Sequence, residues 1–375
     1  MDYTLDQVRG RLIEVHIADI HFGAIDPKTE YDILTEQFTK KIVQLPVIDL
    51  ISIDGDLFDH KCLANSDIVY YASKFVNDLV GISYQKHCTL LLLAGTQSHD
   101  AGQLKLFYHY LEDPNIDIRI VENIRFETVK GAKILCVPEL YEVPEEVYQT
   151  YFKQTDWYDE AICHGTFEGS VYGNNVGAGR LLTPDDFLYC KGPVISGHVH
   201  KPGCFSGFYY YTGCPIRYKF GEEESKGWLL VLHDLDSRLY NIEFEEIISF
   251  RYDTIFLDEL VSTDPKQIID YINNRKINDG IDFIKVKFRV PIDNSNKTII
   301  NNYYRNNSST FVEFLDNKEL EKQKMDAEIA RNDKYSYLMD NSLSDFEKFV
   351  QYINEDMGYK YITVDKLTEM LKEEI

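Results

Sequence analysis

The residues of this sequence best suited to chemistry are Asp and His side chains that directly follow short apolar segments. Five segments end in this way, usually beside a glycine: LIEVHIADIHFG, VIDLISIDGDLFDH, LLLLAGTQSHDAG, DEAICHG and PVISGHVHKPG. Continuous apolar runs of this length are typical of buried strands in a parallel sheet. The carboxyl ends of such strands meet at one edge of the sheet, where open α/β folds bind their ligands.

Carboxylates and imidazoles gathered at one edge would suit small divalent cations. The candidate metal ligands are Asp19, His21, Asp56, His164, His198 and His200. Asp56 stands between segments that carry His, so its carboxylate could bridge two ions about 3.5–4 Å apart, the spacing that clamps both oxygens of an in-line phosphoryl displacement. One such residue alone would be read as a solvated or hydrogen-bonded side chain, but five segments in order indicate a metal site.

The order and spacing of these motifs resemble those of the calcineurin-like metallophosphoesterases. The matching stretches are D-x-H at 19–21, G-D-L-F-D at 55–59, G followed by H-D at 95–100, H-G at 164–165 and G-H-V-H at 197–200. Two further features resemble the SbcD-type DNA-repair nucleases within that superfamily: His16 three residues before Asp19, and the later stretch YYTGCPIRYKFGEEESKGWLLV. The resemblance covers residues 10–250 well and the remainder only in general layout.

The resemblance implies two divalent metal ions, Mn²⁺ in preference to Mg²⁺. The first ion would bind Asp19, His21, Asp56 and His200, and the second would bind Asp56, His164, His198 and an Asn directly before His99. This chain has no Asn there, because Thr96, Gln97 and Ser98 follow Gly95. We expect the oxygen of Ser98 or Gln97, or a water, to fill the place, and the second site to be the weaker one.

The resemblance also implies a catalytic role for His99 as an acid near the leaving oxygen, since the pKa of a His lies near working pH. Asp59 or Asp100 could orient its ring, or both could be surface carboxylates. The implied activity is exonuclease or endonuclease cleavage of DNA ends in repair, recombination or replication, together with an SbcC-type ATPase. Two alternatives stay open: a metallophosphatase or cyclic-nucleotide phosphodiesterase acting on small phosphoesters, and a non-catalytic scaffold that binds DNA ends.

The candidate site residues must be positioned by strands and helices, and the order of the strand-like and helical stretches predicts an α/β fold. Strand-like runs lie near 11–18, 47–54, 88–94, 132–138, 159–164, 192–197, 207–212 and 227–233, and helical stretches lie near 29–45, 66–84 and 101–112. This alternation suits a β-sandwich flanked by helices, which is the metallophosphoesterase architecture that the resemblance implies. We assign it to residues 1–248, as the nuclease domain.

The pattern changes after residue 248, and we expect residues 249–317 to form a small α+β capping domain. The stretch DPKQIIDYINNRK predicts a helix with Asp264 as its N-cap. In DFIKVKFRVPI the side chains alternate, and Lys285, Lys287 and Arg289 share one face. This is the densest basic row of the chain. It is either a DNA-binding face or the solvated face of an ordinary half-buried strand.

Residues 318–375 predict a charged connector followed by a helical tail. Apolar residues repeat at helical spacing in two stretches: Leu343, Phe346, Val350, Ile353 and Met357, then Val364, Leu367 and Leu371. By the resemblance these stripes would bind the coiled coil of the ATPase partner. The alternative is that they fold back onto the core.

The amino-acid composition narrows where this protein is expected to be located and which partners it is expected to bind. Seven Cys without a C-x-x-C pair favour reduced thiols and a cytoplasmic location, in a bacterium or a phage-infected cell. The first residues have no apolar signal region and no run reaches the ~20 residues that span a bilayer, so we expect no membrane association. The net charge of −23 disfavours unaided binding to duplex DNA, so a partner would supply basic surface. The resemblance also allows a homodimer.

Overall fold

The chain folds into two compact units, Met1–Tyr252 and Asp253–Ile375. The sequence pattern places this boundary between residues 248 and 249. The computed structural model describes residues 10–100, 102–139, 143–153, 156–170, 181–257, 262, 264–290, 292–314, 344–355 and 363.

The first sheet of the larger unit has six strands in the order β12-β11-β1-β2-β3-β4. Strands β1 to β4 are parallel, whereas β11 is antiparallel to both β1 and β12. The strands are β1 (Leu12–Ile17), β2 (Leu50–Asp54), β3 (Thr89–Leu93), β4 (Ile118–Val121), β11 (Gly227–Asp234) and β12 (Leu239–Glu246).

The second sheet also has six strands, in the order β5-β6-β7-β8-β10-β9. Strands β6, β7, β8 and β10 are parallel, and an antiparallel strand closes each edge. The strands are β5 (Arg125–Val129), β6 (Ala132–Val137), β7 (Glu160–His164), β8 (Val194–Gly197), β9 (Gly203–Phe205) and β10 (Tyr209–Tyr211).

Both faces of the first sheet are buried, which explains its continuous apolar segments. On β3, Leu90 and Leu92 pack in the core beneath the helices, while Leu91 and Leu93 pack between the two sheets. Successive side chains of a strand point to opposite faces, so a strand buried on both sides must be apolar throughout. The sheets therefore pack face to face through the residues that the helices do not cover.

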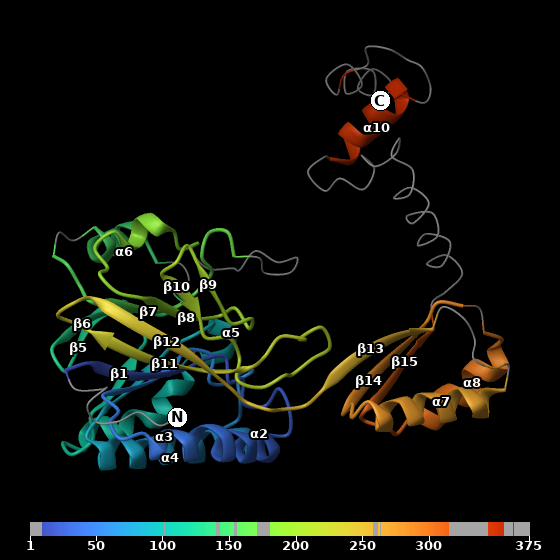
Figure 1. Ribbon diagram of the computed structural model, residues 1–375, viewed down its shortest axis with the longest axis horizontal. Helices are drawn as coiled ribbons and strands as arrows, with labels where there is room; N and C mark the ends of the chain where they lie inside the picture. The colour runs from blue at the N-terminus through green and yellow to red at the C-terminus, as the bar shows by residue number, and fades with distance from the viewer. Residues whose placement is uncertain are drawn as a thin grey trace. The chain divides into compact units, whose positions relative to one another are not determined.

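Helices flank the two sheets, and the predicted α/β class is confirmed. Helices α2 (Pro27–Leu34), α3 (Lys40–Gln44) and α4 (Asp67–Lys86) cover the first sheet, and α6 (Glu145–Phe152) covers the second (Figure 1). The side chain of Ser66 accepts a hydrogen bond from the Val69 amide and caps α4. Two expected helices differ in detail: a π-helical turn separates α2 from α3, and the third is a 3₁₀ helix over Gln103–Glu112.

In the part of the smaller unit up to Phe314, the described residues form a three-stranded sheet and helices α7 and α8. Its strands β13 (Tyr252–Leu257), β14 (Phe283–Phe288) and β15 (Thr310–Phe314) lie in that order, and its helices are α7 (Pro265–Asn278) and α8 (Asn294–Tyr304). The predicted N-cap is confirmed, since the Asp264 side chain accepts a hydrogen bond from the Lys266 amide. On β14, alternate residues Ile284, Val286 and Phe288 are buried in the core of this unit.

The C-terminal segment contributes one described helix, α10 (Asp345–Glu355). Of the apolar residues predicted to bind a partner, Phe346, Val350 and Ile353 fall within α10. The others lie outside the described residues: Leu343, Met357, Val364, Leu367 and Leu371. In the described part of the chain, none of the helices combines the length and the apolar character that crossing a membrane requires.

We expect the core between the two sheets not to tolerate the shortening of a buried side chain. We expect Leu91→Ala to lower the free energy of unfolding by about 2–5 kcal/mol, because it leaves a cavity in a fully buried layer. Urea denaturation followed by tryptophan fluorescence measures this, since both tryptophans of the chain, Trp157 and Trp228, lie in the larger unit. The control is Leu63→Ala, at a leucine that is 77% exposed, with an expected change below about 0.5 kcal/mol. Equal effects of the two substitutions would contradict the packing described.

Candidate metal centre

Loops at the carboxyl ends of four strands bring all six predicted ligands together. Asp19 and His21 follow β1, Asp56 follows β2, His164 ends β7, and His198 and His200 follow β8. They form two groups that could each hold a metal ion, Asp19–His21–His200 and Asp56–His164–His198. Within each group the potential ligand atoms lie within 4.8 Å of one another.

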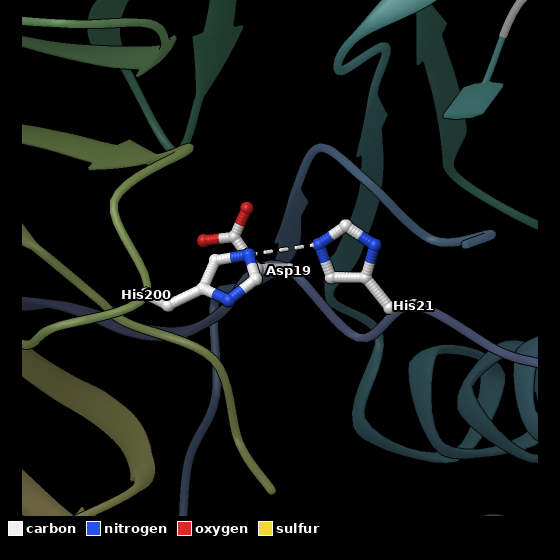
Figure 2. Close-up of side chains that lie close together, drawn as sticks. All are labelled: Asp19, His21 and His200. Atoms are coloured by element: carbon white, nitrogen blue, oxygen red, sulfur yellow. Dashed lines mark hydrogen bonds between the residues drawn. The ribbon is translucent and has the colours of Figure 1, made fainter. Parts of the chain in front are cut away.

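The first group presents two imidazole nitrogens and a carboxylate to one point (Figure 2). His21 Nε2 lies 3.0 Å from His200 Nε2, and the Asp19 carboxylate accepts hydrogen bonds of 2.9 and 3.0 Å from the His198 amide. Burial lowers the pKa of His21 to about 3, so its ring is neutral and offers a lone pair. Nitrogens this close require a proton or a cation between them, and these residues therefore fit a metal ion.

Glu222 supports His200 from the far side of its ring. Its carboxylate lies 3.3 Å from His200 Nδ1, and Lys226 Nζ donates a 2.9 Å hydrogen bond to the His200 carbonyl. Burial lowers the pKa of His200, but hydrogen bonds with Cys214 and Glu222 outweigh it and raise the value to about 10. A carboxylate behind a His is the usual arrangement around bound metals, because it fixes the tautomer and makes the ring a better ligand. Glu222 and Lys226 thus reach the site from a loop that the sequence analysis did not assign to it.

Asp56 lies between the two groups. Its Oδ2 is 3.3 Å from His164 Nε2 and 3.8 Å from His21 Nε2. Burial raises its pKa, but the imidazoles of His164, His21 and His99 outweigh burial and hold it well below its usual range. His164 Nδ1 donates a 2.8 Å hydrogen bond to the Asp54 carbonyl, which leaves Nε2 directed at Asp56. One carboxylate therefore faces ligands of both groups.

The structure brings Thr96 and Glu139 to the second group in place of Ser98 and Gln97. The Thr96 hydroxyl is 3.0 Å from Asp56 Oδ2 and 2.9 Å from Glu139 Oε2. Ser98 and Gln97 are exposed instead, because they begin the short helix α5 (Gln97–Asp100) and the helical turn directs them outward. The side-chain oxygen at this position thus comes from Thr96, the residue directly after Gly95.

Glu139 is another site residue that the sequence analysis missed, besides Glu222 and Thr96. It follows β6, and its Oε2 lies 3.3 Å from His198 Nδ1. Burial raises the pKa of Glu139, but the hydrogen bond to His198 and the nearby His164 outweigh it, and the pKa falls below its usual range. The only available signal was its position at the end of an apolar strand-like run, in a segment without a motif.

His99 lies beside the first group, and its orientation comes from the backbone. Its ring is 4.7 Å from that of His21, nearly perpendicular to it, and its Nδ1 contacts the Asp59 carbonyl. The Asp59 carboxylate instead lies 3.7 Å from His21 Nδ1. The backbone carbonyl of Asp59, and not its carboxylate as expected, therefore orients the His99 ring.

The Asp100 carboxylate does not hydrogen-bond to the His99 ring. It organises the loops around the site instead. Its buried carboxylate accepts hydrogen bonds from the amides of Leu57, Phe58 and Gly95, at 3.4, 3.2 and 3.0 Å. Burial, reinforced by the charge of Asp56, raises the pKa of Asp100 to about 7. The side chain thus ties the loop after β2 to the loop after β3.

The backbone of the site is strained. Among the described residues, eight other than glycine have positive φ, and four of them are candidate ligands: Asp19, His21, Asp56 and His198. Such conformations cost about 1–3 kcal/mol each and persist where surrounding contacts impose them. Here the loops after β1 and β2 hold each other, since the amides of Asp19 and His21 donate to the carbonyls of Gly55 and Asp56.

The basic row of the smaller unit is partly compensated within its own sheet. Lys285 and Lys287 on β14 lie 3.3 and 3.1 Å from the carboxylate of Glu313 on the neighbouring β15. The guanidinium of Arg289 stacks over the Phe256 ring at 3.7 Å. This face therefore carries less net positive charge than its sequence suggests.

Comparisons with known proteins add little. No family model matches the chain, and no curated protein matches it. Among solved structures, 22 chains match. One of them, a crystal structure, is 12% identical with a TM-score of 0.41, over 63% of this chain and 100% of that chain. A likeness of this degree carries no argument about family or function, so the functional argument rests on the residues described above.

Gly95 should be essential for the site. A Cβ at this position would overlap the carboxylate and amide of Asp56. We expect Gly95→Ala to remove most of the bound metal, as measured by elemental analysis after loading with Mn²⁺ and desalting. The matched control is Gly81→Ala, in the middle of α4 where a Cβ meets nothing within 4 Å. A Gly95→Ala protein that folds and retains the same metal content as Gly81→Ala would contradict the proposed position of Asp56.

Proposed function

We propose that this chain is a metal-dependent phosphodiesterase of the SbcD type, within the calcineurin-like metallophosphoesterases, and that it processes DNA ends. The observation that carries the proposal is the convergence of six Asp and His side chains in two groups, with Oδ2 of Asp56 close to imidazoles of both. Phosphodiester cleavage is the chemistry that paired cation sites of this kind support best. The order of the motifs along the chain supports the same assignment.

In this proposal each group holds one divalent ion, with Mn²⁺ as the native metal. Asp19, His21, His200 and Asp56 would hold the first ion. Asp56, His164 and His198 would hold the second, with Glu139 and Thr96 beside them in the place of the missing Asn. Ions bound there would polarise the phosphate oxygens and lower the pKa of a bound water. The buried carboxylates would balance the charge of the ions.

In this proposal, His99 would act as an acid near the leaving oxygen. Its Nδ1 is turned to the Asp59 carbonyl, and this contact retains a proton on Nδ1 in the neutral ring. The second ring nitrogen, Nε2, would then exchange protons with the substrate. A backbone carbonyl cannot ionise, so the orientation of the ring would stay constant as pH changes.

The same proposal includes an SbcC-type ATPase as partner, in the cytoplasm. The chain carries a net charge of −23, and its densest basic row contacts Glu313. Unaided affinity for the phosphates of duplex DNA would therefore be low, and the partner would supply basic surface. The apolar stripe of α10 and the following stretch would bind the coiled coil of that ATPase.

A cleavage assay tests the function. We expect hydrolysis of linear DNA in Mn²⁺, stimulation by a co-encoded ATPase with ATP, and no hydrolysis in EDTA or in Asp56→Asn. The control variant is Asp236→Asn, at an exposed carboxylate in the turn between β11 and β12. Cleavage of small phosphoesters but not of DNA would instead identify a phosphatase or cyclic-nucleotide phosphodiesterase. DNA-end binding without turnover in any metal would identify a scaffold.

His99 should affect turnover without affecting metal binding. We expect His99→Ala to lower the rate by about 10²–10⁴, the usual contribution of a general acid, while elemental analysis shows unchanged metal content. The matched control is His109→Ala, at an exposed His whose ring bonds only a backbone carbonyl nearby. Metal loss in His99→Ala as large as in His200→Ala would show that His99 is a ligand instead.

A further inference from the structure

Tyr218 lies beside the candidate metal centre, in the loop that leads from β10 to β11. Its ring packs at the edge of the apolar core beneath the helices and stands nearly perpendicular to the His21 ring, with the two ring centroids 6.0 Å apart. The side chain is half-buried and is not one of the candidate ligands. Its place between these ligands and the core therefore needs an explanation of its own.

The hydroxyl of Tyr218 holds the loop that carries Asp19 and His21. It donates a hydrogen bond to the carbonyl of Ile20, the residue between these two candidate ligands. Both ligands have positive φ, 50° for Asp19 and 55° for His21, and strained conformations persist only where surrounding contacts impose them. The amides of the two ligands already donate to the loop after β2, and the phenol adds a restraint on the peptide group that joins Ile20 to His21.

Glu30 on α2 supports the same loop. Its fully buried carboxyl group lies 3.4 Å from the Tyr218 hydroxyl and accepts a 3.2 Å hydrogen bond from the Gly23 amide. Burial raises the pKa of Glu30 well above its usual range, so a neutral acid faces the phenol. An ionised carboxylate would compete for the phenol proton, whereas the neutral acid leaves that proton on the Ile20 carbonyl.

The main chain of Tyr218 contacts the group that supports the third ligand. Its amide donates a 2.8 Å hydrogen bond to Oε2 of Glu222, whose other oxygen, Oε1, lies 3.3 Å from His200 Nδ1. The loop with Asp19 and His21 follows β1 of the first sheet, whereas His200 follows β8 of the second. A single residue thus connects both halves of the first ligand group, one through its phenol and the other through its amide.

A phenol suits this position because it donates a hydrogen bond without carrying a charge. A lysine or arginine would repel an ion bound to the neighbouring ligands. A phenylalanine would fill the same space but would leave the Ile20 carbonyl without this donor. Among these side chains, the tyrosine alone holds the loop and leaves the charge of the site to its carboxylates.

We propose that Tyr218 is a positioning residue that aligns Asp19 and His21 with His200 for the first metal ion. This inference rests on the proposed function, because it takes the first group to bind a divalent cation. It names a residue outside the ligand set whose hydroxyl determines how tightly that ion is held. Loss of a partner that orients a ligand typically lowers metal affinity by about 10–100-fold.

The test measures Mn²⁺ binding by calorimetry in full-length protein that carries His198→Ala, so that the second group lacks a ligand and the first is measured. We expect this parent to bind Mn²⁺, and the addition of Tyr218→Phe to weaken the binding by about 10–100-fold. With Co²⁺ in place of Mn²⁺, the visible absorption bands should change as well, because they report the geometry of the ligands.

Two further variants separate the role of the hydroxyl from general stability. The matched control is Tyr31→Phe, which removes a buried phenol that donates a 2.7 Å hydrogen bond to Asp78 and should leave the affinity and the bands unchanged. The conservative variant is a ring-fluorinated tyrosine at position 218. It retains the hydroxyl, so it should bind Mn²⁺ as the parent does, and its fluorine resonance should shift when diamagnetic Zn²⁺ fills the first group.

Two results would overturn the proposal. One is a folded Tyr218→Phe protein that binds Mn²⁺ as tightly as the Tyr31→Phe control, even if its melting temperature falls, since the hydroxyl would then serve stability alone. The other is a fluorine resonance that Zn²⁺ does not move, which decides the question even if Tyr218→Phe does not fold. In both cases the parent still binds Mn²⁺ and the proposed function stands. A parent that binds no Mn²⁺ would refute that function and this inference together.

Discussion

The carboxylate of Asp56 is the group on which the candidate metal centre depends, because it faces imidazoles of both ligand groups. It is almost fully buried and its pKa lies well below the usual range, so its charge is available at any ordinary pH. Every other feature of the site keeps this carboxylate in place. Gly95 leaves room for it, whereas Gly55 leaves room for the neighbouring His164 ring. Thr96 donates to the Asp56 carboxylate through both its amide and its hydroxyl.

Both sheets of the larger unit contribute candidate ligands to the site. The first sheet contributes Asp19, His21 and Asp56, and the second contributes His164, His198 and His200. Their packing must therefore be accurate, since a small slip of one sheet would separate the halves of each group. The core between the sheets provides this rigidity through apolar side chains.

Charge is distributed unevenly between site and surface. Near the candidate metal centre, buried carboxylates and imidazoles compensate one another and would be balanced further by cations. In the smaller unit, the single carboxylate of Glu313 contacts two lysines of the basic row and offsets part of their charge. A protein of this charge has little means of attracting nucleic acid alone, which is why the proposed function includes a partner with basic surface.

The sequence by itself determined the α/β class and the types of residue at the strand ends, because apolar runs and the residues that follow them are local patterns. In the larger unit, strands β4, β5, β9 and β12 escaped prediction, since their half-exposed or short segments lack such runs. Only the tertiary structure decided which oxygens complete the second group. Glu139 is separated from Thr96 by 43 positions in the chain, and α5 turns Gln97 and Ser98 outward.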